Sequence, residues 1–362
     1  MQKAPANLYQ ALVKAIAFAA GIFILLWFLY TTLSIVLLLL LAIVVAISIN
    51  APVTRLERKN IRRLWASLLV FFIIFLVMGL LGWLIVPRIM AQLKTLINDL
   101  PLYTAKIQAA ISGWLKNFPG LVKEPPAGTA PPGWTSFLPG ALWRIGGYSI
   151  SFIGSILLVV VFISIVAYMV VDPRPMVELY LSLFSPPQRD KAQRAFIQSS
   201  VMIIGWMRSN LIGGFIEAVC VVLFLSLMHV PGAWVWGALT FFAEMIPRIG
   251  FYIMSVPPIL VSLSVSAMTA VWVTVFFLIL AEIIGDFIMP RLRSSTMNLH
   301  PVSVLFVLLA MGAAFGFVGI LLASPVAAII KAFYEEFYLS RFEEDTQMEN
   351  RIDSIIYVQK KT

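Results

Sequence analysis

The chain has 362 residues, of which 61% are hydrophobic and only 12% are charged, and its mean hydropathy is +0.96. This composition excludes an ordinary soluble domain, in which about a quarter of the residues are charged. The net charge of +9 does not indicate nucleic-acid binding, because the basic residues gather in short loops between apolar segments, where membrane topology and anionic lipid headgroups explain them.

Several apolar stretches reach the roughly 20 residues that an α-helix needs to cross the hydrocarbon core of a membrane. They are too long, and alternate too little, to be strands of a membrane barrel. The sequence therefore predicts an all-α fold, a polytopic helical integral membrane protein with two broken-helix or re-entrant segments in its C-terminal half.

Residues 1–87 are predicted to form N-terminal transmembrane helices around a cytoplasmic basic loop. Apolar spans at 13–30 and 33–52 are separated by an expected turn at "YTT", and a third span follows at 66–87. A cluster of basic residues in a short loop marks the cytoplasmic side, and two preceding crossings then place the amino terminus there as well. The basic residues of this loop are Arg55, Arg58, Lys59, Arg62 and Arg63.

Residues 88–146 are predicted to be extracytoplasmic. Apolar positions recur every four residues from Tyr103 to Leu115, which is typical of an amphipathic helix. The segment "FPGLVKEPPAGTAPPGWTSFLPG" then predicts an extended connection, since Pro and Gly disfavour a helix.

Residues 147–208 are predicted to contain a span at 150–171 and a second basic loop. Its positive charge predicts that it lies in the cytoplasm, on the same side as the first basic loop. Another span at 209–228 begins the C-terminal region 209–333, and this span ends at the turn "HVPG".

Two segments of the C-terminal half are too long for one crossing. Residues 233–265 are interrupted by Pro247 and Gly250, and residues 302–333 are interrupted around "MGAAFGFVG". Each is either two full spans or one re-entrant hairpin, with an ordinary span at 269–289 between them. Either interpretation returns the charged tail, residues 334–362, to the cytoplasm.

The stretch "GALTFFAEMIPRIGFYIMSVPP", a helix ending in "GDFIMP", and "NLHPVSVLFVLLAMGAAFGFVGILLASPVAAIIKAF" together resemble the autoinducer-2 exporter family of bacterial membrane proteins. Arg248 departs from the family pattern, in which Tyr or Asn is common, and Asp286 stands where Asn is expected. The positions that carry the resemblance are Pro247, Gly250, Pro290, His300, Pro301, Gly316, Gly319 and Pro325.

The resemblance implies secondary transport of small solutes, classically the export of a quorum-sensing signal, in the bacterial inner membrane. It also implies a homo-oligomer, of which a pentamer is one form, and sodium or proton antiport is credited to some relatives. Independently of the resemblance, broken helices at membrane depth are tolerated where their freed backbone groups are buried or line a cavity, so the two broken segments are expected to form the binding site. Hairpins entering from opposite faces would suit an elevator-like motion.

Ionisable residues at membrane depth are expected to find partners or water, because an isolated charge there is costly. Glu244, Pro247, Arg248 and Gly250 are the predicted substrate site or gate, in which Arg248 holds an anionic or polyhydroxylated solute. The alternative is that Glu244 and Arg248 form an internal ion pair at a hairpin tip.

Glu217, Glu282 and Asp286 are predicted to couple transport to an ion or proton. Glu282 and Asp286 are four residues apart, so they share a helix face. The alternative for Asp286 is a headgroup position beside Arg291 or Arg293. Other positions are expected to act as helix breaks or in packing, namely Pro290, Pro301, Gly312, Gly316, Gly319 and Pro325.

No metal, cofactor or enzymatic activity is expected. His229 and His300 have no neighbours at metal-ligand spacing, and Cys220 is a single cysteine expected in helix packing. The chain has no Walker A sequence, dinucleotide fingerprint or nucleophile elbow.

The sequence thus predicts a secondary transporter or exporter of small solutes that works by alternating access or an elevator-like motion. A monovalent cation/proton antiporter and a non-transporting membrane scaffold are the alternatives. The expected partners are membrane lipids, a small-molecule solute, H⁺ or Na⁺, and further copies of the chain.

Overall fold

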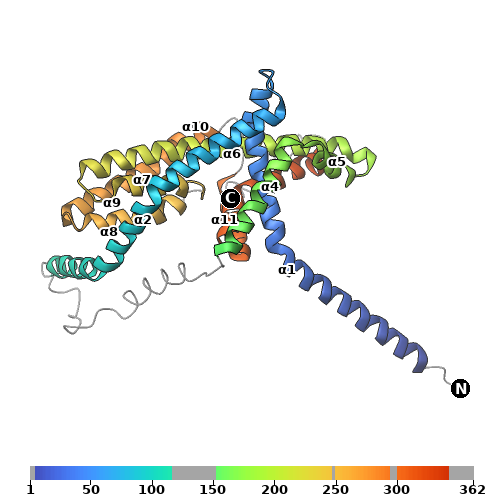
Figure 1. Cartoon of the computed structure of the whole chain (residues 1–362). Coiled ribbons are helices and arrows are strands. Elements are labelled where there is room, and N and C mark those ends of the chain that lie inside the picture. Colours follow the sequence, from blue (N-terminus) through green and yellow to red (C-terminus); the bar gives the residue numbers. More distant parts are fainter. Residues whose placement is uncertain (1–4, 116–151, 247–248, 294–299, 342–362) are drawn as a thin grey trace, which may run out of the picture.

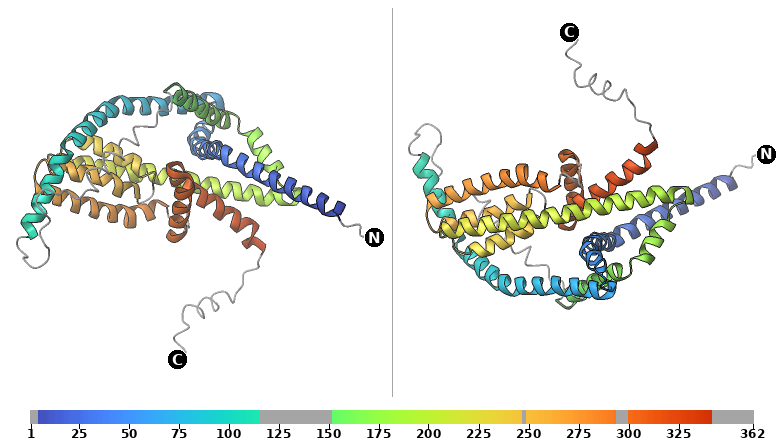
Figure 2. Two further views of the ribbon diagram at one scale, coloured as in Figure 1. Left: turned by 90° about the horizontal axis from the view of Figure 1, so that it is seen from below. Right: turned by 90° about the horizontal axis from the view of Figure 1, so that it is seen from above.

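The protein is helical throughout the residues that the computed structural model describes, which are 5–115, 152–246, 249–293 and 300–341 (Figures 1 and 2). Within these ranges, and by length and composition, five helices could cross a membrane when residues 302–337 are counted as one, or six if one bent pair is also counted as a span. The predicted all-α, multi-pass membrane architecture is confirmed.

Two long helices form the N-terminal part, α1 (Pro5–Glu57) and α2 (Arg63–Leu115), each of 53 residues. The prediction of a turn at "YTT" is wrong, because α1 continues through these residues. Thr31 and Thr32 donate their hydroxyl hydrogens to backbone carbonyls of Trp27 and Phe28 one turn earlier, so both fit inside a helix.

The continuity of α1 and α2 changes the topology expected from hydropathy. Because α1 does not reverse at residues 30–32, the two crossings expected before the basic loop become one helix. The prediction of a cytoplasmic amino terminus depended on two crossings and is no longer supported. Similarly, the helix expected near Tyr103 is not a separate element but the last part of α2. The Pro/Gly-rich connection after it lies outside the described residues, as does the end of the tail.

The middle of the chain begins with α4 (Phe152–Val171), close to the predicted span. The chain then bends by 87° into the short helix α5 (Arg174–Ser182) and passes through a 3₁₀ turn, η1 (Pro186–Gln188). The next helix, α6 (Arg189–Leu227), has 39 residues. Much of the expected basic loop is therefore the first half of α6, which packs on α11 (Pro301–Phe337).

The first broken segment is a helical hairpin. Helices α7 (Ala233–Ala243) and α8 (Ile249–Ser262) have 11 and 14 residues, or about 16 and 21 Å, too short to cross about 30 Å of hydrocarbon. A Cβ atom on Gly250 would overlap the backbone carbonyl of Ala243. This close approach shows that α8 returns along α7.

The segment between the two broken regions is α9 (Ala267–Glu282), a π-helical turn η2 (Ile283–Ile288) and α10 (Met289–Arg293). Together they recover the span predicted at 269–289. The extra residue of a π-helical turn shifts the helix face locally, so the side chains before and after η2 do not keep the spacing of a regular α-helix.

The second broken segment, within α11, is also a hairpin, and the short turn η3 (Leu339–Arg341) follows it. Gly316 has φ 61° and ψ −141°, a conformation that residues with a side chain rarely adopt. A Cβ atom on Gly319 would overlap the backbone carbonyl of Met311, although these residues would lie about 12 Å apart along a straight helix. The chain therefore folds back at Gly316.

Three buried clusters hold these elements together, and α1 and α6 link them. The first joins α1, α2 and α4, and the second joins α6 with α7–α10. The third, built from Val44, Ile203, Trp206 and Leu322, joins α1, α6 and α11. The N-terminal helices and the hairpin-containing C-terminal helices thus form two packed units, which are joined where α1 packs on α6 and α11.

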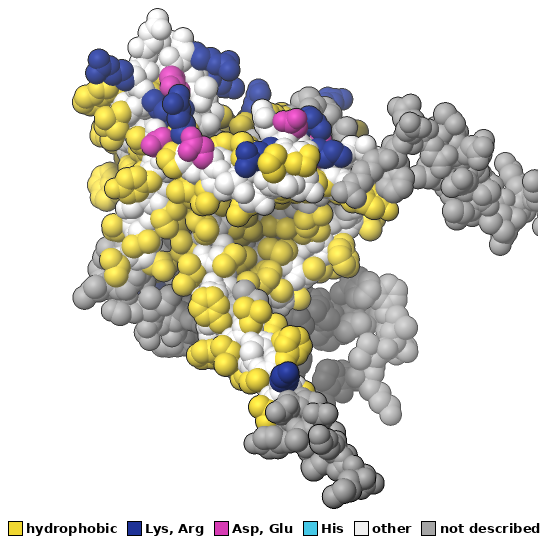
Figure 3. All heavy atoms as spheres, turned by 90° about the vertical axis from the view of Figure 1, so that its right-hand side faces the viewer, with side chains coloured by type: hydrophobic (Ala, Val, Ile, Leu, Met, Phe, Trp, Pro, Cys, Tyr) yellow, Lys and Arg dark blue, Asp and Glu magenta, His cyan; other side chains and the backbone are white. Residues whose placement is uncertain are grey.

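Charged side chains gather at one end of the molecule above a wide hydrophobic surface (Figure 3). In the turn between α1 and α2, Arg63 pairs with Glu57 at 3.0 Å and donates a hydrogen bond to the carbonyl of Val170, 2.9 Å away, at the end of α4. The apolar belt and charged end are what a membrane-spanning protein requires.

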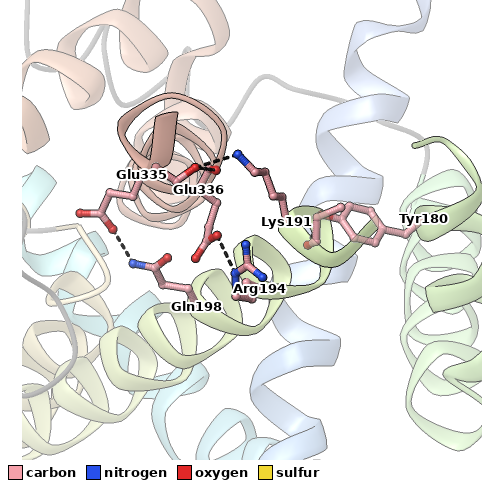
Figure 4. A network of polar contacts seen from close by, with 8 residues as sticks. Tyr180, Lys191, Arg194, Gln198, Glu335 and Glu336 are labelled. Carbon is pink, nitrogen blue, oxygen red and sulfur yellow. Dashed lines mark hydrogen bonds and ion pairs between the residues drawn. The ribbon is translucent and has the colours of Figure 1, made fainter. Parts of the chain in front are cut away.

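Polar contacts also join the start of α6 to the end of α11 (Figure 4). Arg194 pairs with Glu336 at 2.8 Å, Lys191 donates to the Ser340 hydroxyl at 2.9 Å, and Gln198 donates to Glu335. Beside them, ring contacts connect Tyr180, Phe184, Phe196, Phe333 and Phe337.

We expect the Arg194–Glu336 pair itself to contribute little to stability. The Arg194 side chain is 54% exposed, so water screens the pair, and a coupling of about 0.2–1 kcal/mol is expected. Unfolding in detergent of Arg194→Gln, Glu336→Gln and the double variant measures this coupling, with Arg189→Gln as the control. A coupling well above that range would show that the polar network, rather than the aromatic cluster, holds α6 to α11.

Candidate functional site

A small cavity with three carboxyl groups lies among the helices of the C-terminal unit. Its volume is about 60 Å³, and it is enclosed by α6, α7, α8, α9, η2 and α10. Glu217, Glu244 and Glu282 contribute their side chains to its wall, and Tyr252 contributes a phenol. Apolar residues and Gly285 complete the lining.

Glu217 and Glu244 form the buried part of this site. Their relative exposures are 2% and 5%, and their carboxyl groups are hydrogen-bonded to each other. The second oxygen of Glu217, Oε2, has no hydrogen-bond partner among the described residues. A carboxyl group with an open acceptor is therefore enclosed beside a cavity large enough for water.

Small residues on α6 make this approach possible. A Cβ atom on Gly214 would lie 2.8 Å from the carbonyl oxygen of Phe241 and 3.3 Å from the Cβ of Glu244. A Cβ atom on Gly213 would lie 2.7 Å from the sulfur of Met289. Because these positions are glycines, the end of α7 and the start of α10 can lie directly against α6, one turn from Glu217.

Glu282 and Tyr252 form the exposed side of the cavity. The Tyr252 hydroxyl donates to Oε1 of Glu282 at 3.2 Å. Glu282 is the last residue of α9 and immediately precedes the π-helical turn, whose residues Ile284 and Gly285 also line the cavity. Such turns are frequent at functional sites because they redirect side chains.

The arrangement suits a proton or a small cation. A hydrogen bond between two carboxyl groups needs a proton on one of them, since neither carboxylate has a hydrogen to donate. The cavity is far below the roughly 300–1,000 Å³ of typical sites for organic ligands. Among the described residues no group of three or more His, Cys, Asp or Glu side chains is placed to hold a metal ion.

The predicted site residues fall into three groups. Glu217, Glu244 and Glu282 line one cavity, although the sequence assigned Glu244 to a different role from the other two. Gly250 is the second residue of α8 and lies against the last residue of α7, Ala243. Pro247 and Arg248 lie outside the described residues. Asp286 is exposed and does not belong to the cavity lining.

The predicted helix breaks lie at structurally distinct positions. Gly316 is the reversal point of α11, and a Cβ atom on Gly312 would lie 2.9 Å from the side chain of Ile320 in the returning arm. Pro301 is the first residue of α11, where the His300 ring nitrogen Nδ1 accepts a hydrogen bond from the backbone N–H of Val302 at 3.3 Å. Pro290 is exposed in α10, and Pro325 is buried inside α11.

Sequence reasoning missed Tyr252 and the polar face of α6. Asn210 and Glu217 are both buried and lie seven residues apart, with Gly213 and Gly214 between them, so they share one helix face. This spacing of small and polar residues in an apolar helix was the available signal. Tyr252 carries no comparable signal, since its partner belongs to another helix.

Comparison with known proteins agrees with this architecture. The sequence model described as AI-2E family transporter matches residues 16–339, nearly the whole chain. The chain belongs to the AI-2E transporter family. Membership makes it a membrane transport protein and confirms the resemblance carried by the broken C-terminal segments.

Relatives of this AI-2E transporter come from distant bacteria. It is 25% identical over 298 residues to "Putative transport protein YueF" of Bacillus subtilis (strain 168), covering 78% of this chain and 79% of that protein. It is 25% identical over 315 residues to "Putative transport protein sll0063" of Synechocystis, covering 80% and 74%. It is also 31% identical over 113 residues to "AI-2 transport protein TqsA" of Escherichia coli (strain K12), covering 31% and 33%.

Proposed function

We propose that this protein is a secondary transporter of small solutes that is coupled to protons through Glu217 and Glu244. The observation that carries the proposal is the hydrogen-bonded carboxyl pair, buried at the break between α7 and α8. Broken helices at membrane depth are where transporters of several folds bind solute and coupling ion, and the chain belongs to a transporter family.

The pair supplies a reason for coupling. With one shared proton its net charge is minus one at most, and a further proton makes it neutral. Each charge left at membrane depth costs about 2.5–3.5 kcal/mol on insertion scales. Loss of a proton therefore favours a conformation in which the pair is hydrated, and this links proton release to movement of the hairpin.

The moving part that we propose is the C-terminal unit. Its helices α7, α8 and α9 share one buried cluster, and α1, α2 and α4 share another. Two packed units that are joined where α1 packs on α6 and α11 suit alternating access by an elevator-like motion, with the N-terminal helices as the fixed part. The hairpins would then carry the carboxyl cavity across the membrane.

We propose that the solute is a small polar molecule, as the family resemblance implies. One relative is named "AI-2 transport protein TqsA", which supports AI-2, the signal that the family resemblance implies, as a candidate solute. Because the carboxyl cavity is too small for an organic solute, we propose that the solute binds at a separate position. Arg248, which the sequence predicts as its contact, lies outside the described residues. Glu244 then connects the coupling pair to the solute site.

A monovalent cation/proton antiporter is the second candidate. It is favoured by Glu282, which lines the same cavity and accepts a hydrogen bond from Tyr252. Carboxylate oxygens and water are suitable ligands for a small hard cation such as Na⁺. In this alternative the exchanged cation takes the place of the organic solute.

We also propose a setting for this activity. The bacterial inner membrane suits the family, and the basic residues near Arg63 and Arg194 favour a cytoplasmic position for the charged end that also holds the end of α11. In the most apolar part of the α2 span Arg63–Arg88, only 6% of the residues are buried within one chain. Further copies of the chain, as in a homo-oligomer, would cover part of this surface.

Flux measurements in sealed liposomes test the proposal. The purified protein is reconstituted, and uptake of labelled solutes, of Na⁺ and of protons is followed under an imposed pH gradient. Tyr252→Phe removes one hydrogen bond, worth about 1 kcal/mol, so we expect a roughly fivefold change in the concentration for half-maximal proton or cation activation with little change in maximal flux.

The outcomes separate the candidates. Organic-solute flux that follows the pH gradient supports the proposed exporter, and Na⁺–proton exchange lost in Glu282→Gln supports the antiporter. Absence of flux for every solute and ion, from a protein that remains folded and oriented in the liposome, would overturn both. Glu178→Gln, which changes an exposed carboxylate on α5, is the matched control.

A further inference from the structure

A second and much larger hollow lies between the two units, and it has a different character from the carboxyl cavity. It measures about 570 Å³ and is bounded by α2, α6 and α7. Leu81 and Leu84 of α2 face Phe215, Leu223 and other apolar side chains of α6 and α7. The two cavities share no lining residue.

The floor of this groove is the contact between α6 and α7. A Cβ atom on Gly237 would overlap the side chain of Val222 and lie 2.9 Å from the carbonyl oxygen of Ala218, so these two helices pack too closely to leave room between them. The opposite wall is α2, which belongs to the N-terminal cluster. The groove is therefore a seam between the two packed units.

Among the described lining residues, the one that is charged lies at the end of the apolar span. Arg88 is the last residue of the span Arg63–Arg88, its side chain is exposed, and it forms no ion pair with the carboxylates of the described residues. In Figure 1, α2 and α6 run in the same general direction, and α7 returns along α6. Trp234, at the start of α7, therefore lies toward the same end of the groove as Arg88.

We propose that this groove binds an acyl chain of an anionic membrane phospholipid, whose phosphate is held by Arg88. The apolar wall matches a hydrocarbon chain, and a guanidinium can donate two parallel hydrogen bonds to a phosphate. Trp234 is 68% exposed at the same end, as expected of a tryptophan at the level of lipid headgroups. A small polar solute would find one charged group and otherwise hydrocarbon.

The site is separate from the proposed transport chemistry, because no carboxyl residue and no residue of the carboxyl cavity is among its described lining residues. A lipid there fills the space between α2 and the hairpin-bearing helices. Its binding can therefore be measured on the purified protein without any flux assay, and failure of the transport proposal would not affect it.

Native mass spectrometry of the full chain in detergent tests the site. Dioleoylphosphatidylglycerol and dioleoylphosphatidylcholine are added in equal amounts, and the lipid retained per chain is counted. We expect one retained lipid with a preference of about fivefold for phosphatidylglycerol, the effect of one basic residue near anionic lipid. Arg88→Gln should bring this preference close to one, whereas Lys94→Gln, a cation on the same helix outside the groove, should leave it unchanged.

Filling the groove provides the second measurement. Ala238→Trp from α7 and Leu84→Trp from α2 should each reduce retention of both lipids, because a bulky ring occupies the acyl-chain space from opposite walls. Variants are compared only where their thermal unfolding resembles that of the unsubstituted protein. Because the two substitutions lie on different helices, one of them can be used if the other prevents folding. Unchanged retention in the folded variant, or an unchanged headgroup preference in Arg88→Gln, would overturn the site. A change in oligomeric mass with unchanged lipid would instead assign the groove to a second copy of the chain.

Discussion

Glu217→Gln is expected to weaken the pH dependence of transport and to slow transport by about tenfold or more, as the loss of a functional intramembrane carboxyl would. Glutamine keeps the size of the side chain and can still hydrogen-bond Glu244, but it cannot take up or release a proton. The buried pair then loses one of its two titrating groups, so proton release biases the hairpin less and only through Glu244. The measurement is the rate of solute or Na⁺ flux in liposomes between about pH 5.5 and 8.5.

Two comparisons make this result specific. Glu217→Asp keeps a titrating group, so some pH dependence should return even if the rate stays low. Glu178→Gln removes an exposed carboxylate and should behave as the unsubstituted protein does. If Glu217→Gln transported with its normal pH profile, the pair would be a structural hydrogen bond and coupling would have to be sought elsewhere, first at Glu282.

The second large effect is expected from the hairpin glycines. Gly250→Ala and Gly319→Ala each place a Cβ atom against a backbone carbonyl, of Ala243 and of Met311, which cannot rotate away. The arms of the hairpin must separate, and overpacking of this kind costs about 1–3 kcal/mol or more. We expect a lower melting temperature in detergent for both variants and a loss of flux that exceeds the loss of folded protein.

Other glycines of the same chain are the controls. Gly79 and Gly82 on α2 have no atom within 4 Å of an added Cβ, so alanine there should be neutral or should stabilise the helix by about 0.5–1 kcal/mol. Gly316→Ala has equal space but a φ of 61°, so its cost would come from backbone strain alone, about 1–3 kcal/mol. Equal melting temperatures for Gly250→Ala and Gly79→Ala would show that the α7–α8 contact is looser than described.

Much of the architecture followed from local properties of the sequence. The span at 150–171 closely matches α4, and the breaks at Gly250 and around Gly316 are hairpin turns. Hydropathy predicts such elements because burial in lipid depends on each segment's own composition. Glycine and proline mark the breaks because they change the conformations that the backbone can adopt.

The extents of the long helices were not predicted. The turn expected at "YTT" and the loop expected before residue 209 are both helical, within α1 and α6. Threonines can satisfy their hydroxyls inside a helix, and a polar stretch such as the start of α6 becomes helical when another element packs on it. Local polarity alone does not distinguish these cases from a loop.

The candidate site also combines properties of single segments with contacts between segments. Local composition was enough to predict a multi-pass helical membrane protein whose C-terminal half contains two breaks. It also predicts that Glu217, Glu244 and Glu282 lie at membrane depth. The contacts of Glu217 with Glu244 and of Tyr252 with Glu282, and the groove that α2 forms with α6 and α7, are visible only in the folded protein. Those contacts depend on how closely separate helices approach, which is set by packing at positions such as Gly214 and Gly237 and not by the composition of any one segment.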